Sequence, residues 1–270
     1  MTEQAKGLTA AIVDAPGKLA ARCNGFYAIN LYLPLWAASR ACNTRLRAWR
    51  GVKNLHVQAT RLPRIPWSAV IPRRPIHLAA ISRHDGNVRL GELAILAQAA
   101  AATRPGDEII EIGTFNGRTT LNLSLNAPRA SPIFTLDLLS HQPTQFRLAS
   151  GERHFVDKPF PGERFLSCAR QWRDDAARIV QLAGDSATFD WSMHLRKAGL
   201  VFVDGSHAYH YTRLDSETAF RLVAEGGVVL WHDYGVWEGV TTALEELDAE
   251  RKLGLQHIRG TSLVVWRADN

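Results

Sequence analysis

Cysteine is scarce in this chain, and the cysteines that occur are far apart. Cys23, Cys42 and Cys168 are the three thiols, and no two of them form a Cys-x-x-Cys pair. A disulfide framework or a zinc knuckle would need several closely spaced cysteines. The sequence therefore favours a protein of a reducing compartment whose fold does not depend on disulfides.

Long apolar runs are also missing. No stretch approaches the roughly 20 residues that a membrane-spanning helix needs, and the first residues, MTEQAKGLTA, lack the basic-then-apolar order of a secretory signal. Hydrophobic residues make up 46% and charged residues 21% of the 270 positions, as in ordinary soluble proteins. We expect a cytoplasmic protein with one large domain, alone or with an extension.

Acidic residues are scarce in the first part of the chain only. Residues 1–77 hold 12 Lys and Arg against 2 Asp and Glu, whereas residues 78–270 hold 20 against 24. The first part ends in RLPRIPWSAVIPRRPIH (61–77), whose prolines predict a docked arm rather than a helix or a strand. We therefore divide the chain into an N-terminal extension, 1–77, and a main domain, 78–270.

The composition of this extension fits more than one role. Its mixture of Trp, Tyr, Leu and Arg is typical of an interfacial membrane segment or of a contact for an anionic partner. The simpler interpretation, which we prefer, is that the extension packs on the main domain or on a second copy of the chain. Its arginines would then face water.

From residue 88 onward, segments with helical spacing alternate with short β-branched runs. Such alternation predicts a doubly wound α/β fold with a mostly parallel sheet, whose ligands bind outside the carboxyl ends of the strands. The predicted strands are 108–113, 133–138, 178–184, 199–205, 226–234 and 262–267, and the predicted helices are 88–103, 117–127, 209–224 and 240–252.

Two of the predicted strands end in polar residues. LVFVDGSHAYH (200–210) places Asp204 and His207 after one strand, and VVLWHDY places His232 and Asp233 after the next. Because parallel strands have their carboxyl ends at the same edge of a sheet, we expect these four side chains to converge on one site.

The turn after the first predicted strand is rich in glycine. In EIIEIGTFNGRTT, Gly113 and Gly117 permit a tight turn and close approach of a ligand, and the following helix offers free N–H groups. A dinucleotide fingerprint that starts at Gly113 would need glycines at 115 and 118, where the chain has Phe115 and Arg118. This pattern argues against an NAD site.

The Glu-x-Gly-x-x-x-Gly pattern instead resembles motif I of the class I S-adenosylmethionine-dependent methyltransferases. In that family the backbone near the first glycine faces the methionine part of the cofactor. The resemblance extends over residues 88–267 and implies an α/β, doubly wound, mostly parallel, seven-stranded Rossmann-like sheet. It implies cofactor contacts for Glu111, Gly113, Thr114, Phe115 and Gly117.

Two further landmarks follow in the order that this family shows. Asp137 ends the second strand, where an acidic residue accepts hydrogen bonds from ribose hydroxyls. LAGDSATF ends the third strand, and in the family the Asp and Ser of such a segment, here Asp185 and Ser186, lie near the adenine. The resemblance thus implies S-adenosylmethionine as the cofactor.

The segment from Phe202 to Tyr234 is similar to a narrower group, the metal-dependent small-molecule O-methyltransferases that include macrolide-sugar enzymes. By this resemblance, Asp204 and Asp233 bind a divalent cation, His207 is the general base, and Asp204 also borders the cofactor. The chain departs from the pattern at His232, which stands where some relatives carry an acid. Mg²⁺ prefers the two carboxylates, and Mn²⁺ would tolerate His232 as a further ligand.

These residue types suit methyl transfer to a hydroxyl group. A hydroxyl must be deprotonated or polarised before it attacks, which a carboxylate-bound cation and a nearby imidazole can both assist. Structural roles are the alternative: Glu111 and Gly113 would only shape a turn, Asp204 would cap the next helix, and His207 would bond to a neighbour there. The recurrence of Asp233 at the next strand end leads us to prefer the metal site.

Residues 138–178 form a long connection for such a fold, and long connections over a site often act as lids. Its basic residues include Arg147, Arg153, Lys158 and Arg164, which would suit an acidic substrate or would simply be solvated.

The sequence therefore predicts a metal-assisted O-methyltransferase for a small molecule, such as a glycosylated metabolite or a saccharide precursor. A hydroxylase-like enzyme of the same fold is one alternative, and a non-catalytic domain that binds a membrane surface or an anionic polymer is another. No Asn-Pro-Pro-Tyr or Pro-Cys motif points to nucleic-acid methylation. A homo-oligomer also remains open.

Overall fold

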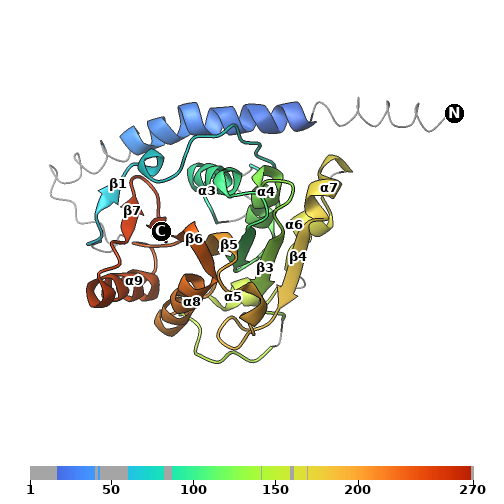
Figure 1. The fold of residues 1–270 in the computed structure, drawn as a ribbon. Coiled ribbons are helices and arrows are strands. Elements are labelled where there is room, and N and C mark those ends of the chain that lie inside the picture. The colour runs from blue at the N-terminus through green and yellow to red at the C-terminus, as the bar shows by residue number, and fades with distance from the viewer. Residues whose placement is uncertain are drawn as a thin grey trace.

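The computed structural model describes residues 17–39, 42, 60–81, 87–140, 142–158, 161–168 and 170–268. Helices lie on both sides of a central sheet (Figure 1). Its eight strands in the described ranges are β1 (Arg64–Ile65), β2 (Glu108–Ile112), β3 (Ile133–Asp137), β4 (Ile179–Ala183), β5 (Ala198–Val203), β6 (Val223–Trp231), β7 (Gln256–Ile258) and β8 (Val264–Arg267). The main helices are α3 (Leu90–Ala102), α4 (Arg118–Asn126), α8 (Tyr209–Leu222) and α9 (Glu238–Arg251).

The strand order is β1-β7-β8-β6-β5-β2-β3-β4, and every pairing is parallel except those of β8 with β6 and β7. The predicted α/β, mostly parallel sheet is confirmed. The sheet has one strand more than the seven expected, because Arg64 and Ile65 of the N-terminal extension pair with β7. That segment is therefore partly a strand, contrary to the prediction for 61–77. The chain reverses its direction of winding between β2 and β5, which is where ligands bind in such sheets.

Alternate residues of the central strands pack on opposite faces of the sheet. Leu200 and Phe202 contribute to a core shared with α3, whereas Val201 and Val203 contribute to a second core shared with α8 and α9. A sheet covered on both faces needs apolar residues at nearly every position, which explains why β5 reads as a continuous apolar run. Burying each such side chain stabilises the fold by about 1.5–3 kcal/mol.

The extension contributes a helix over residues 17–39, which contains a π-helical turn at Ala28–Tyr32 (η1) and lies beside α3 (Figure 1). Its inner face joins the core shared with α3 through Ala28, Ile29 and Leu33. Gly91 of α3 lets Leu33 approach closely, since a Cβ there would lie 2.9 Å from the Leu33 side chain.

The same helix also carries large apolar side chains that face solvent. Phe26 is 66% and Leu35 is 69% exposed, and Leu19, Tyr27 and Leu31 are exposed as well. Among the described residues, no helix is both long enough and apolar enough to cross a membrane.

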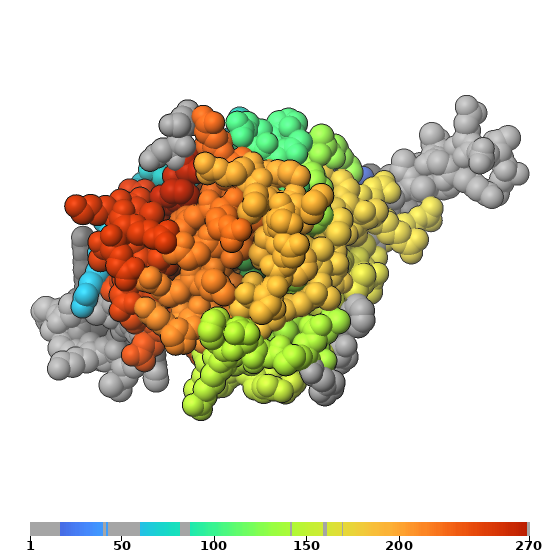
Figure 2. All heavy atoms as spheres, turned by 60° about the horizontal axis from the view of Figure 1, so that its bottom comes forward, coloured from blue at the N-terminus to red at the C-terminus, as the bar shows by residue number. Residues whose placement is uncertain are grey.

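The long connection after β3 folds over the carboxyl ends of the strands. It contains the short helices α5 (Arg153–Val156), α6 (Glu163–Leu166) and α7 (Arg173–Ala176). Figure 2 turns this edge of the molecule toward the viewer and shows the yellow-green part of the connection beside the orange segments that follow β5 and β6. The connection therefore lies where a lid would lie.

Candidate active site

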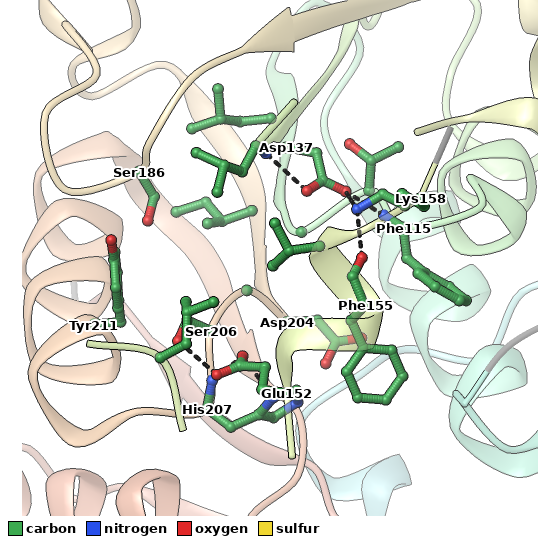
Figure 3. Close-up of a pocket in the computed structure, with 18 of the residues that line it drawn as sticks. Phe115, Asp137, Glu152, Phe155, Lys158, Ser186, Asp204, Ser206, His207 and Tyr211 are labelled. Atoms are coloured by element: carbon green, nitrogen blue, oxygen red, sulfur yellow. Dashed lines mark hydrogen bonds and ion pairs between the residues drawn. The ribbon is translucent and has the colours of Figure 1, made fainter. Parts of the chain in front are cut away.

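A cleft of about 980 Å³, open to solvent, lies at the carboxyl ends of β2, β3, β4 and β5. Its walls combine the turns after these strands with residues of the 138–178 connection (Figure 3). The sequence-predicted residues that line it are Gly113, Thr114, Phe115, Asp137, Asp185, Ser186, Asp204, His207 and Asp233.

The turn after β2 can be made only with glycine at its first position. Gly113 has a φ of +102°, and a Cβ there would lie 2.0 Å from the Asp204 carbonyl oxygen. The absence of a side chain lets the turns after β2 and β5 touch. Gly117 also has a positive φ, and Phe115 adopts one (+48°) although it is not glycine. Such a conformation at a non-glycine residue costs about 1–2 kcal/mol, so packing around the turn must hold Phe115 in place.

Gly113→Ala is expected to lower the free energy of unfolding by at least about 4 kcal/mol, because it combines left-handed strain with overlap of two backbones. Gly151→Ala is the matched control: Gly151 has a φ of +84°, but no atom lies within 4 Å of the position that an added Cβ would take. Strain alone should cost this control about 1–2 kcal/mol. Urea unfolding of both variants measures the difference, and equal losses would show that the contact with Asp204 is unimportant.

Asp137 lies in the cleft, but its carboxylate already bonds to other groups of the protein. Phe115 N–H donates to it at 2.6 Å, Leu138 N–H donates at 2.7 Å, and Lys158 Nζ lies 2.9 Å away (Figure 3). Burial raises the pKa of Asp137, and Lys158 opposes that increase. Of the four basic residues singled out in the connection, only Lys158 lines the cleft. The role of Asp137 toward a ribose remains a prediction.

Asp185 and Ser186 follow β4, the strand beside β3, and they also line the cleft. The carboxylate of Asp185 accepts hydrogen bonds from the Tyr211 hydroxyl at 2.7 Å and from Gln145 N–H at 2.6 Å. These bonds join α8, the turn after β4 and the connection after β3. The three segments therefore form one wall of the cleft.

Glu111, like Gly117, is a predicted cofactor contact that does not line the cleft. It is fully buried in β2, where the hydroxyls of Thr120 and Thr135 donate to its Oε2. Burial raises the pKa of Glu111 to about 8. The side chain supports the cleft from behind, and a direct cofactor contact for it remains a prediction.

Asp204, His232 and Asp233 come together as the sequence predicted. One candidate ligand atom from each residue lies within 4.8 Å of the others, and His232 Nδ1 is 3.0 Å from Asp204 Oδ1 and 3.3 Å from Asp233 Oδ1. Asp233 has a φ of +64°. Asp204 does not cap α8, since the residue that precedes this helix is Ala208 and no side chain caps it.

The charges of this cluster are strongly coupled. Burial opposes the charged form of His232, but Asp204 and Asp233 raise the pKa of His232 well above its usual value. Burial likewise raises the pKa of Asp204, whereas His232 and His207 hold the pKa of Asp233 far below its usual range against the effect of burial. The cluster thus pairs carboxylates with protonated imidazoles, and a bound cation would replace part of this positive charge.

His207 bridges two carboxylates. Its Nδ1 lies 2.9 Å from Glu152 Oε1 and its Nε2 lies 2.8 Å from Asp233 Oδ2, and its ring stacks on Trp237 with centroids 4.5 Å apart. Burial opposes protonation, but hydrogen bonds to both carboxylates raise the pKa of His207 to about 9. The two carboxylates and Trp237 together hold the ring in one orientation.

Two buried carboxylates at the site were not predicted from the sequence. Glu152 accepts from Ser206 Oγ, from His207 N–H and from Ala149 N–H, and Glu92 of α3 lies 3.3 Å from His232 Nε2. Glu152 lies 55 positions before His207, and Glu92 lies 140 before His232. Neither belongs to a spaced motif, so only the fold brings each one to its histidine.

Comparison with known proteins agrees with this architecture. Residues 110–234 match the family model of the methyltransferase domain. A search of curated proteins found no match. The solved structure of the O-methyltransferase NovP is 16% identical, covers 69% of this chain and 83% of its own chain, and has a TM-score of 0.51. CalS11, a calicheamicin methyltransferase, is 15% identical, with coverages of 69% and 80% and a TM-score of 0.51.

The two solved structures share the fold of this chain. The matched range contains the glycine turn and every predicted site residue from Glu111 to Asp233. The resemblance to class I S-adenosylmethionine-dependent methyltransferases is thereby confirmed, with a match to the methyltransferase domain model over residues 110–234.

Proposed function

We propose that this protein transfers a methyl group from S-adenosylmethionine to a hydroxyl oxygen of a small molecule, with the help of a divalent cation. The observation that carries the proposal is a single cleft that joins the glycine turn at Gly113 to Asp204, His207 and Asp233. Because NovP, whose fold is similar, is an O-methyltransferase, a hydroxyl oxygen is the first nucleophile to test.

The cofactor would lie along the turns after β2, β3 and β4. The Gly113 turn leaves room for the methionine part, and Asp137, Asp185 and Ser186 supply polar groups farther along the same wall. S-adenosylmethionine supplies a methyl group activated as a sulfonium, so a C–O bond forms as the S–C bond breaks and S-adenosylhomocysteine remains. The task of the protein is to align the two reactants.

The residues at the ends of β5 and β6 fit a divalent cation. Two carboxylates and one imidazole offer ligand atoms within 4.8 Å of one another, and Asp204 and Asp233 also face the cleft. When bound, such an ion supplies positive charge that polarises an acceptor hydroxyl and offsets the carboxylate charge that raises the pKa of His207.

His207 is placed to take the proton of the acceptor. Glu152 holds its Nδ1 side, so Nε2 is the nitrogen that points toward Asp233 and the cleft. An imidazole flanked by carboxylates is a stronger base than a free one, because the charge that it gains is stabilised. A cation held by Asp233 would lower the pKa of His207 and free Nε2 of its own proton, and Nε2 would then accept the proton lost by the hydroxyl.

The acceptor is proposed to be a compact molecule that carries a hydroxyl, such as a saccharide or a glycosylated metabolite, with Lys158 near enough to favour an acidic group. Leu148, Phe155 and Val156 give the connection an apolar surface toward the cleft. A mixed polar and apolar wall suits a sugar ring or an aromatic alcohol better than a long polymer.

The proposal is tested with isotope-labelled S-adenosylmethionine, Mg²⁺ or Mn²⁺, and a panel of sugar nucleotides, glycosides and phenols. Mass spectrometry should detect label on an acceptor oxygen together with S-adenosylhomocysteine. Label found only on nitrogen or carbon acceptors would contradict the assignment to oxygen.

A further inference from the structure

Glu92 is held in one position by hydrogen bonds from the start of its own helix and from Ser262, a distant part of the chain. It lies in the first turn of α3 and is buried. Its Oε1 accepts from Ser262 N–H at 2.8 Å and from Ser262 Oγ at 2.9 Å, and its Oε2 accepts from Arg89 N–H at 2.9 Å. With its acceptor sites used in this way, the carboxylate has little freedom to move.

This fixed carboxylate faces His232 from the side opposite the candidate metal ligands. His232 Nε2 lies 3.3 Å from Glu92 Oε2, whereas Nδ1 faces Asp204 and Asp233. A carboxylate can only accept at this nitrogen, so the Nε2 proton is donated to Glu92. Nδ1 also faces carboxylates, so it too carries a proton when no cation is bound. A cation held by Asp204 and Asp233 would take the place of the Nδ1 proton, while the Nε2 proton stays with Glu92.

A metal-binding histidine commonly donates its other ring N–H to a carboxylate in this way, which fixes the tautomer and strengthens the ligand. A nitrogen ligand favours borderline transition metals, whereas Mg²⁺ favours oxygen ligands and retains its water. Glu92 gives His232 this kind of support from α3.

We propose that Glu92 is a positioning residue that makes His232 a nitrogen ligand, so that this centre selects Mn²⁺ or a similar transition-metal ion over Mg²⁺. The proposal rests on the metal centre of the proposed function. Glu92 lies outside the residues that match the methyltransferase family model, so α3 would tune a site that the matched domain builds.

Glu92 also has a purely structural role to be separated from this one. Its bond to Arg89 N–H closes the first turn of α3, as in a capping box. A helix cap has no influence on which ion binds at β6. The test must therefore measure metal binding as well as the integrity of the fold.

The experiment compares the full-length protein with Glu92→Gln, His232→Asp and Glu108→Gln. Glu108→Gln is the matched control, because Glu108 pairs with His194 Nδ1 at 2.8 Å at the other end of the sheet. Mn²⁺ binding is followed by electron paramagnetic resonance, with Mg²⁺ as competitor, and S-adenosylhomocysteine binding is followed separately by calorimetry.

The wild-type protein should show coupling of bound Mn²⁺ to one ¹⁴N nucleus, and His232→Asp should abolish this coupling. Glu92→Gln should weaken Mn²⁺ binding by about 10–100-fold, with less effect on Mg²⁺, and Glu108→Gln should change neither. Cofactor binding should be unchanged in all four proteins.

Bound Mn²⁺ without nitrogen coupling would overturn this inference and leave the metal-assisted function standing. Equal loss of Mn²⁺ and Mg²⁺ affinity in Glu92→Gln would reduce Glu92 to a structural residue. Cofactor binding without any metal binding would overturn both the inference and metal assistance, but not methyl transfer itself.

Discussion

Asp204→Asn should lower the rate of methyl transfer by about 10³-fold or more, because a loss of several kcal/mol of charge stabilisation has this effect on a rate. The carboxylate lies in the cleft and pairs with His232, so it is a candidate metal ligand of the proposed site. Asparagine preserves the shape and leaves the backbone contact with Gly113 in place. The measurement is turnover at saturating cofactor, together with the dissociation constant of S-adenosylhomocysteine, which should stay nearly constant.

Asp157→Asn is the control for this experiment, since Asp157 is an exposed carboxylate of the connection that pairs only with Arg153 among the described residues. It should retain full turnover. If Asp204→Asn unfolds or loses cofactor binding, the residue has a structural or cofactor role instead. Retention of turnover would remove Asp204 from the mechanism.

Glu152→Gln should reduce turnover by about 10²-fold, within the range that a general base contributes. Glu152 accepts four hydrogen bonds, two of them from His207, and a glutamine side chain offers one acceptor oxygen where the carboxylate offers two. The variant should therefore free the His207 ring and loosen the connection over the cleft. Turnover should fall far more than the affinity for S-adenosylhomocysteine.

A spectroscopic readout separates this positioning role from a general loss of structure. The Nδ1 proton that His207 shares with Glu152 should give a downfield proton resonance in the wild type that disappears in Glu152→Gln. Glu163→Gln, an exposed acid in α6 of the same connection, is the control and should keep both the resonance and the rate. An unchanged rate in Glu152→Gln would contradict the role given to Glu152.

The parallel core of the fold could be predicted from the sequence because its strands are buried on both faces. Such strands are continuous apolar runs, and polar residues at their ends mark one edge of the sheet. The glycine turn could also be predicted, because two glycines directly after a buried strand indicate a tight turn. The structure gives the reason for Gly113, where a side chain would overlap the Asp204 carbonyl. Local physical constraints therefore located most of the cleft.

The remaining parts depend on contacts between distant segments. The two residues of β1 form a strand only because β7 offers a partner. The apolar inner face of the helix over 17–39 is explained only by its packing on α3. Glu92 and Glu152 carry no periodic or motif signal of their own. Each contacts a histidine that the fold brings to it across a long sequence separation.

The most direct test of the central claim is calorimetric titration of S-adenosylhomocysteine into metal-stripped protein, repeated with Mn²⁺ and with the Asp233→Asn variant. The account predicts micromolar cofactor binding in all cases, and a separate Mn²⁺-binding event that Asp233→Asn removes. Absence of cofactor binding under every condition would contradict the assignment of this cleft as a methyltransferase site.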